Sequence, residues 1–412
     1  KLAEKARPEY VLLVKGKVTA RPPGTINPAL KTGEVEVKAE TLTILNSSKT
    51  PPFEIEDELA VEENLRLKYR YLDLRRPAIM NNLLVRHQVV TAVRQFLNAQ
   101  GFIEVETPML TKSTPEGARD FLVPSRLQPG HFYALPQSPQ LFKQILMVSG
   151  LERYYQIARC FRDEDLRADR QPEYTQIDLE LSFATTEDIL NLIEELMKAV
   201  FAAVGKSIKT PFPRLSYDEA IKRYGTDKPD LRFELVIEDV SELFAASDFK
   251  VFAQTVAGGG AVRALKVCPP EAFSRKELDS LTEFAATLGS KGLAYFYVES
   301  PTEIKSPIAK FLTEAEVTAL VKKMKAHPGD FIFAIADEKI KSAHLLGALR
   351  AELASRLNLL TPDVYVFTWV LDFPLFHFNE EEKRLDSEHH PFTRPKAEDL
   401  ALLDKEPLAV KA

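Results

Sequence analysis

The stretch that decides the fold runs from residue 154 to residue 183. It begins with the mostly apolar run Tyr154-Tyr155-Gln156-Ile157-Ala158-Arg159-Cys160-Phe161 and returns in the run from Tyr174 to Phe183. Between them lies Arg162-Asp163-Glu164-Asp165-Leu166-Arg167-Ala168-Asp169-Arg170-Gln171. The two runs predict the strands of one hairpin. Loops of this length inside a compact domain tend to carry function, so we expect the charged segment to be functional.

The charged segment interleaves both signs. Its arginines are suited to bidentate contacts with phosphate oxygens. Its carboxylates are suited to holding Mg²⁺, or to keeping the arginines extended before a substrate arrives. The alternative interpretation is a salt-bridged surface loop, which is the commoner situation. The position at the end of a buried hairpin favours the functional interpretation.

Two polar segments precede the hairpin. The first, Thr111-Lys112-Ser113-Thr114-Pro115-Glu116-Gly117-Ala118-Arg119-Asp120, has the composition of a mobile loop. The second, Ala134-Leu135-Pro136-Gln137-Ser138-Pro139-Gln140-Leu141-Phe142-Lys143, predicts a turn that opens a helix. Gln140 and Lys143 are three residues apart and share one helical face, which suits a carboxylate ligand. An ordinary helix surface is the alternative.

A further landmark lies upstream. Residues 82–99 have apolar side chains at a spacing of three to four, which predicts a helix, and Gly101 is a natural residue to follow its end. Residues 102–107 then predict a strand that stops at Pro108. Helix–glycine–strand units are common, so this landmark is weak when taken alone.

The chain divides into five predicted parts. Residues 1–50 contain short strands and predict the C-terminal part of an oligonucleotide-binding (OB-fold) β-barrel, which needs about five strands to close. Residues 51–66 predict a linker. Residues 67–232 and 361–412 predict one domain, to which a strand at 364–371 belongs, and residues 233–360 predict an α+β insertion into it. The fold class is therefore α+β and multidomain, with an antiparallel sheet flanked by helices.

Composition excludes several classes of protein. The chain has 412 residues, 45% of them hydrophobic, and a net charge of -6, which is ordinary for a globular protein and argues against a uniformly basic nucleic-acid-binding surface. We find no run of about 18 apolar residues, so no membrane association is expected. Cys160 and Cys268 are the only cysteines, which argues against a disulfide framework or a cysteine-rich zinc site and indicates a reducing compartment, the cytoplasm. His389-His390, as neighbours on a strand, would point to opposite faces and make poor metal ligands.

Taken together, the ordered motifs closely resemble the class II aminoacyl-tRNA synthetases, and within them the bacterial aspartyl enzymes of subclass b. The resemblance runs from Tyr71-Leu72-Asp73-Leu74-Arg75 to His389-His390-Pro391-Phe392-Thr393. The helix and strand that end at Pro108 resemble motif 1, which builds the homodimer interface in that family. The predicted hairpin with its charged loop resembles motif 2.

The resemblance implies which residues bind ATP. Arg162 is the catalytic residue, because it would hold the α-phosphate of ATP together with an aspartate carboxylate oxygen. Tyr174 occupies the place of a phenylalanine that stacks on adenine in the family, and tyrosine stacks comparably. Arg167 would meet the 3′ end of tRNA. The implied ATP-binding residues are Arg162, Asp163, Glu164, Gln171 and Tyr174.

The resemblance also implies the aspartate site. Lys143 would pair with the side-chain carboxylate of the substrate, while Ser138 and Asp178 would hold its α-ammonium group. Glu116 lies on a loop expected to close over aspartate, and His389 lies on a second covering segment. The implied aspartate-binding residues are Glu116, Ser138, Gln140, Lys143, Arg162, Asp178 and His389.

Further expectations follow from the same resemblance. The substrates are L-aspartate, ATP with Mg²⁺, and tRNA(Asp), with tRNA(Asn) left open. Motif 3 is not found before Ala412 and the chain does not begin with Met, so we expect residues to be missing at both ends, including the Mg²⁺-binding acids. No metal ligand is therefore assigned within the sequence, and residues 1–412 alone are expected not to catalyse exchange. Asparaginyl or lysyl enzymes of the same fold and a non-catalytic tRNA-binding relative are the alternatives.

Overall fold

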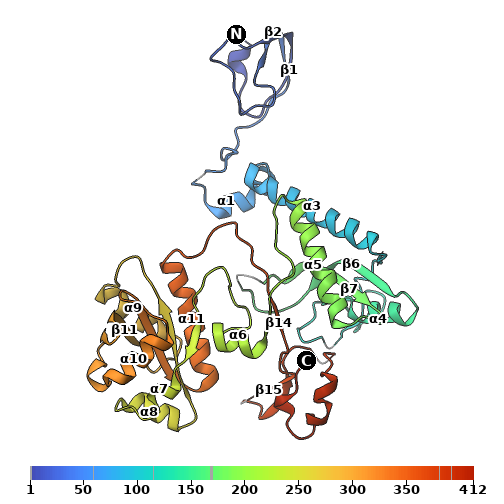
Figure 1. The fold of residues 1–412 in the computed structure, drawn as a ribbon. Coiled ribbons are helices and arrows are strands. Elements are labelled where there is room, and N and C mark those ends of the chain that lie inside the picture. Colours follow the sequence, from blue (N-terminus) through green and yellow to red (C-terminus); the bar gives the residue numbers. More distant parts are fainter. Residues whose placement is uncertain (1, 59, 115, 168–169, 380, 391) are drawn as a thin grey trace. The chain divides into compact units, whose positions relative to one another are not determined.

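The computed structural model describes residues 2–58, 60–114, 116–167, 170–379, 381–390 and 392–412. Four residues of the motifs quoted above lie outside the described ranges: Pro115, Ala168, Asp169 and Pro391. Contacts between Cα atoms divide the chain into two compact units, residues 1–91 and residues 92–412. Figure 1 shows the elements of both units. The domain boundaries at 50, 66, 232 and 360 stay predictions.

The first unit contains one long hairpin. Strands β1 (Val11–Ala20) and β2 (Val35–Asn46) pair antiparallel, with register shifts after Val11 and after Lys15. Both strands are longer than the sequence pattern predicted. Most of their side chains are exposed, as expected of strands that pair with each other and not with further strands. The OB-fold barrel stays a prediction.

A buried carboxylate organises the rest of the first unit. Asp73 ends the short helix α2 (Arg70–Asp73), which follows α1 (Glu63–Lys68), and its side chain is 0% exposed. Oδ1 lies 2.9 Å from Arg66 Nε and 2.9 Å from Arg76 Nη1, and Oδ2 accepts a bond from Arg70. These guanidinium groups, Arg66 first, lower the pKa of Asp73 to about 2.

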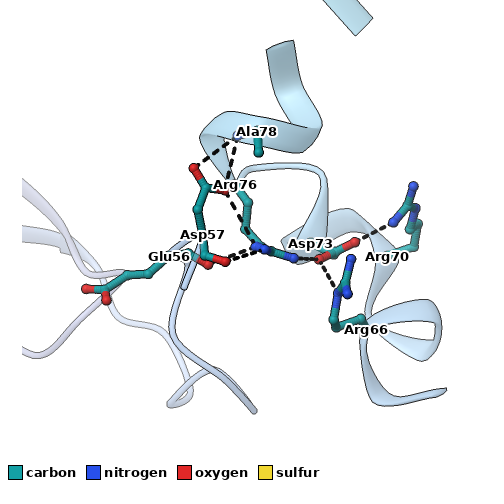
Figure 2. A network of polar contacts seen from close by, with 7 residues as sticks. All are labelled: Glu56, Asp57, Arg66, Arg70, Asp73, Arg76 and Ala78. Carbon is teal, nitrogen blue, oxygen red and sulfur yellow. Dashed lines mark hydrogen bonds and ion pairs between the residues drawn. The ribbon is translucent and has the colours of Figure 1, made fainter. Parts of the chain in front are cut away.

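The same cluster ties the linker to the next helix (Figure 2). Arg76 donates from Nε to the carbonyl oxygen of Glu56 and from Nη2 to that of Asp57, each at 2.8 Å. The Asp57 carboxylate in turn accepts from the backbone N–H of Ala78, at 3.1 Å, in the first turn of α3 (Pro77–Ala99). Buried or half-buried charges here all have partners, which is how a protein tolerates them away from water.

The predicted helix and strand of motif 1 are present with changed bounds. Helix α3 begins at Pro77, five residues before the predicted start, and Gly101 adopts φ +79 after its end. The strand is shorter than predicted, because only β3 (Ile103–Glu104) pairs with a neighbour. It runs parallel to β6 (Arg153–Phe161), whereas β6 pairs antiparallel with β7 (Glu173–Leu181). The three-stranded sheet β3-β6-β7 is therefore mixed: its β6–β7 pair is antiparallel, as predicted, and its β3–β6 pair is parallel.

The residues on either side of the predicted insertion are neighbours in the structure. Strand β8 (Arg214–Ser216) pairs in parallel with β14 (Trp369–Leu371), so residues far apart in sequence are neighbours. The strand predicted at 364–371 is formed only over its last three residues. The preceding aromatic side chains pack without strand pairing: Phe367 stacks on Phe212 at 4.9 Å between ring centroids.

The segment between those two strands forms its own five-stranded antiparallel sheet, in the order β12-β11-β13-β10-β9. The alternating residues of its central strand β13 belong to two different cores, one on each face. Helices α9 and α11 cover one face and α7, α8 and α10 the other (Figure 1, yellow to orange). The bounds are β9 Ile237–Asp239, α7 Ser241–Phe244, α8 Lys250–Ala257, β10 Ala261–Val267, α9 Arg275–Thr287, β11 Ala294–Ser300, β12 Glu303–Lys305, α10 Glu314–Lys323, β13 Phe331–Asp337 and α11 Lys339–Arg356.

Further helices and strands complete the second unit. Among the helices that the structure describes, none has the length and apolar character needed to cross a membrane. The remaining elements are β4 Leu122–Pro124, β5 Phe132–Ala134, α4 Gln140–Val148, α5 Thr186–Ala203, α6 Tyr217–Tyr224, β15 Phe376–Asn379 and β16 Arg384–Ser387.

Candidate active site

The β6–β7 hairpin positions the candidate site. Its nine residue pairs run from Arg153 opposite Leu181 to Phe161 opposite Glu173. Paired residues of antiparallel strands share a face, and side chains alternate along each strand. One face of the hairpin therefore carries, pair by pair, Tyr154 with Glu180, Gln156 with Asp178, Ala158 with Gln176 and Cys160 with Tyr174.

Lys143 lies against this face. It is on helix α4, is 9% exposed, and its Nζ lies 2.8 Å from Asp178 Oδ1 and 3.3 Å from Glu180 Oε2. The helix begins at Gln140, which confirms the predicted helix start. Gln140 is half-buried on the same helix, and no hydrogen bond joins its side chain to another residue of the described ranges.

The charge of Asp178 is only partly compensated. Its side chain is 2% exposed, and burial raises the pKa of its carboxyl group above the ordinary value although Lys143 acts in the opposite direction. Oδ1 is bonded to Lys143, but Oδ2 is buried without a hydrogen-bond partner among the described residues. A buried acceptor left in this state favours a ligand that donates to it.

Arg162 follows β6 directly and also has a buried polar atom without a hydrogen-bond partner among the described residues. Its guanidinium lies 5.6 Å from the ring centre of Tyr174, and its Nε is buried without a partner in the described part of the chain. Between Arg162 and Asp178, burial raises the pKa of the Cys160 thiol to about 11, with Asp178 raising it further and Arg162 lowering it. Tyr174 lies on the hairpin face that carries Asp178, so the guanidinium of Arg162 at the Tyr174 ring and the ammonium group of Lys143 at Asp178 lie over the same face.

The charged loop surrounds two hollows. One, of about 440 Å³, is lined by Arg162, Glu164, Gln171 and Tyr174, which are four of the five residues predicted to bind ATP. The fifth, Asp163, lines a second hollow of about 370 Å³ that also contains Arg167. Within the loop Arg170 lies 3.6 Å from Glu164, an exposed pair that fits both a loop with arginines held by carboxylates and an ordinary salt-bridged surface loop.

The loop of residues 111–120 is docked on this site. Ser138 donates to Glu116 Oε2 at 2.6 Å, and Thr114 donates to Glu116 Oε1 at 3.0 Å. The backbone N–H of Asp163 donates to the carbonyl oxygen of Arg119 at 3.0 Å. Ser138 and Asp178 were predicted to hold the same ammonium group, but they have different partners in the structure. Ser138 contacts Glu116, and Asp178 contacts Lys143.

His389 is not brought to the other predicted residues. Its ring lies 4.7 Å from that of Phe373, and it lines a hollow of about 540 Å³ with Asp227 and Lys228. No contact joins it to Lys143 or Arg162 in the described ranges. Its role in covering aspartate stays a prediction.

Three residues of the site were missed by the sequence analysis. Glu180 contacts Lys143, Gln176 lies 3.3 Å from the Cys160 sulfur, and Gln137 is buried and bonded to the 111–120 loop. The first two were detectable, because they alternate with Asp178 and must share its face. Gln137 gave no signal, since a glutamine in a turn is ordinarily exposed.

No cluster of three or more His, Cys, Asp or Glu side chains suited to a metal ion occurs in the described ranges. The acidic residues of the charged loop that the structure describes, Asp163, Glu164 and Asp165, do not form such a cluster.

Comparisons with known proteins agree on one family. The model for tRNA synthetases class II (D, K and N) matches residues 62–411. An aspartate–tRNA(Asp/Asn) ligase of Moorella thermoacetica is 58% identical over 100% of this chain and 68% of its own. The ligase of the same name from Syntrophomonas wolfei is 56% identical, over 100% and 70%, and an aspartate–tRNA ligase of Geobacillus kaustophilus is 55% identical, over 100% and 70%.

Solved structures give a weaker likeness. Asparaginyl-tRNA synthetase from Pyrococcus horikoshii, complexed with asparaginyl-adenylate, is 19% identical, with a TM-score of 0.46 over 85% of this chain and 82% of that one. The enzyme of the same name from Entamoeba histolytica gives a TM-score of 0.47 at 17% identity, over 85% and 82%.

Proposed function

The chain belongs to the class II tRNA synthetases of the D, K and N group, and on this premise we propose that it activates L-aspartate with ATP and transfers the aspartyl group to the 3′ end of tRNA(Asp). The names of relatives that are 55–58% identical over the whole chain support this reaction. Two of those names include tRNA(Asn) and one does not, so tRNA(Asn) is a substrate to be tested separately.

One observation carries the proposal. A buried ion pair, Lys143 with Asp178, lies over the same strand face as Arg162, and both Asp178 Oδ2 and Arg162 Nε lack partners among the described residues. Aspartate brings one ammonium group and two carboxylates. Its ammonium suits Asp178, its side-chain carboxylate suits Lys143, and its α-carboxylate suits Arg162, so the charges of ligand and site are complementary.

The chemistry that Arg162 supplies is electrostatic. An aspartate carboxylate oxygen attacks the α-phosphorus of ATP, a bond to that phosphorus forms, and the bond to pyrophosphate breaks. Negative charge on the phosphate increases along the way, so a fixed guanidinium stabilises the transition state more than the ground state. No protein nucleophile is needed, and the Cys160 thiol, with a pKa raised by burial to about 11, is protonated at neutral pH.

The hollow beside Arg162 is the proposed nucleotide site. The Tyr174 ring offers an aromatic surface for adenine, while Gln171 and Glu164 line the same hollow. Asp163 is assigned to ATP as well, although it lines the neighbouring hollow together with Arg167. We assign Arg167 to the acceptor end of the tRNA.

Selection of aspartate over asparagine follows from Lys143. A substrate carboxylate forms a charged hydrogen bond with Lys143 that an amide replaces only with a neutral one, while Lys143 keeps Asp178 and Glu180 as partners in either case. Gln140 shares helix α4 with Lys143 and is assigned to the same ligand. Glu116 and His389 are assigned to the two segments that cover it.

Three further features complete the proposal. Helix α3 has the exposed apolar side chains Met80, Leu83 and Leu84, which suit a homodimer interface. The β1–β2 hairpin is assigned to an anticodon-binding barrel. The unpaired cysteines suit the cytoplasm. ATP enters with its Mg²⁺ ion, for which no residue of this chain is assigned as a ligand.

The test is ATP–pyrophosphate exchange by the natural protein that contains these residues, with aspartate, asparagine and lysine supplied separately. Aspartate should support the fastest exchange by at least about 100-fold. Faster exchange with asparagine or lysine contradicts the proposal. Charging of purified tRNA(Asp) and tRNA(Asn) then decides the range of tRNA substrates.

A further inference from the structure

Gln137 is a buried amide that no step of the proposed reaction uses. It lies in the turn between β5 and α4, and its side chain is 1% exposed. Oε1 accepts from the backbone N–H of Ala118 at 3.0 Å, and Nε2 donates to the carbonyl oxygen of Ala118 at 2.8 Å and to Asp120 Oδ1 at 2.6 Å. Both amide donors are used, one by the backbone of Ala118 and one by the side chain of Asp120, so all three bonds go to residues 118–120.

That stretch belongs to the 111–120 loop. Backbone bonds hold the loop at its two ends: Thr111 exchanges two bonds with Ala134, and Phe121 accepts from the N–H of Leu135 at 2.9 Å. Between these ends, the Gln137 side chain bonds to the backbone N–H and carbonyl oxygen of Ala118, as a neighbouring strand would. Besides the backbone bond from Asp163 to Arg119, side chains hold the middle of the loop, so loss of the side-chain bonds should make opening easier while the ends stay in place.

The position of Glu116 depends on this attachment. Glu116 lies two residues before Ala118 and accepts from Ser138, the residue that follows Gln137. Its charge also acts on Asp178, whose pKa it raises further. The turn therefore contacts the loop at two points, because Gln137 bonds to Ala118 and Asp120 and Ser138 bonds to Glu116. These bonds keep the Glu116 carboxylate near the buried ion pair.

We propose that Gln137 is a positioning residue that latches the 111–120 loop against the aspartate site and so sets the affinity for the amino acid. The assignment of aspartate rests on the proposed function, whereas the latch itself rests on the hydrogen bonds at Ala118 and Asp120. Arg119, next to Ala118, accepts from the backbone N–H of Asp163, and this bond does not involve the Gln137 side chain.

The residue type fits this task. Glutamate at position 137 would keep an acceptor for the N–H of Ala118 but would lose both donors and bring its charge against Asp120. Leucine would fill the space and lose all three bonds. Gln137→Leu and Gln137→Glu therefore remove the latch in two different ways, and Gln128→Leu is a matched control at an exposed glutamine in the nearby turn.

The loop provides its own reporter. Lys112 is exposed and lies within the loop, so trypsin cleaves after it once the segment opens. In the natural protein that contains these residues, without substrates, we expect cleavage after Lys112 to accelerate at least about tenfold in both Gln137 variants and to be unchanged in Gln128→Leu. In the exchange reaction, we expect KM for aspartate to rise at least about tenfold, with KM for ATP within about twofold of the parent value.

The outcomes separate the two proposals. Unchanged cleavage after Lys112 in both Gln137 variants overturns the latch. A uniform acceleration at every tryptic site, or an equal rise of KM for ATP, also overturns it, because general destabilisation then explains the data. If Gln137→Leu shows no cooperative thermal transition, Gln137→Glu decides. If the parent protein shows no aspartate-dependent exchange, the proposed function fails while the cleavage comparison still tests the latch.

Discussion

Two buried carboxylates, Asp73 and Asp178, face basic side chains in different parts of the chain, and their electrostatics are opposite. Asp73 is surrounded by three guanidinium groups, and its pKa is lowered to about 2, first by Arg66 (Figure 2). Asp178 has one ammonium group, which it shares with Glu180, and burial raises its pKa. One Asp178 oxygen is without a hydrogen-bond partner among the described residues.

The difference shows how a closed ionic cluster can be told from an open one. At Asp73 the hydrogen bonds end on the protein itself, on the carboxylate and on the backbone of residues 56 and 57, so the cluster holds the chain together. At Asp178 and Arg162 polar atoms are buried without partners in the part of the chain that the structure describes. Buried atoms without a hydrogen-bond partner in that part of the chain also occur at Thr19 and Asp337. What marks the open cluster is that Asp178 and Arg162 lie over one strand face, where a single ligand could complete both.

The largest effect is expected at the open site. Lys143→Met removes the charge that partly compensates Asp178 and that the proposed substrate carboxylate requires. Removing one partner of a buried charge pair in a binding site costs about 2–5 kcal/mol, so kcat/KM for aspartate in the exchange reaction should fall at least about 30-fold. The control is Lys198→Met, at an exposed lysine of α5. Exchange by Lys143→Met within tenfold of the parent rate contradicts the interpretation.

The closed cluster should give the next largest effect, on stability and not on chemistry. Asp73→Asn leaves buried guanidinium groups short of negative charge, so the midpoint of thermal unfolding should fall by on the order of 5 °C. The values of kcat and KM of the folded protein should stay within about twofold. Glu58→Gln, at an exposed carboxylate of the same linker, is the control. A loss of exchange activity without a loss of stability would assign Asp73 to the active site.

These two regions also differ in how far the sequence predicted them. The strands of the β6–β7 hairpin were predicted to within one or two residues, and a helix was predicted to open within residues 134–143, because long runs and a proline-containing turn are strong local signals. The alternation of side chains along β7 is enough to predict that Tyr174 and Asp178 lie on the same face of the hairpin. Glu180 follows from it as well, although it was not selected.

Other features were beyond the reach of local patterns. The parallel pairing of β3 depends on which strand lies beside it, and two paired residues are too few to give a period. The segment Tyr69-Arg70-Tyr71-Leu72-Asp73-Leu74-Arg75-Arg76 does not indicate which of its charges is buried, because α1 and α2 have only six and four residues. The partners of Arg76 lie some twenty residues earlier in the chain, and such contacts are set by tertiary structure.

The two carboxylates should also respond to pH with opposite signs. Asp73 has a lowered pKa, so its stabilising contribution is present above about pH 4 and fades as the pH falls towards about 2. Asp178 has a raised pKa, so its contribution is largest below about pH 4 and decreases as the pH rises above that value.

Urea unfolding between pH 3 and pH 7 measures this contrast. The stability of the parent protein relative to Asp73→Asn should increase from pH 3 towards pH 4 and then remain constant. Relative to Asp178→Asn, the stability of the parent should decrease above about pH 4. The same slope for both comparisons would mean that Asp178 is as fully compensated as Asp73, and the distinction between the closed and the open cluster would then be lost.

The smallest effect is expected at Tyr174, where the open site meets the proposed nucleotide hollow. Tyr174→Phe keeps the aromatic ring, which lies 5.6 Å from the Arg162 guanidinium, and removes only the hydroxyl group. Because an aromatic face binds a base or a cation mainly through its π-system, KM for ATP should change less than about threefold. Tyr174→Ala removes that face and should raise KM for ATP about tenfold or more, since stacking on one base contributes about 1–3 kcal/mol. If the phenylalanine variant were impaired as much as the alanine variant, the hydroxyl group would be the important feature. Tyr174 would then act through a polar contact, and the hollow beside Arg162 would need a ligand other than a stacked base.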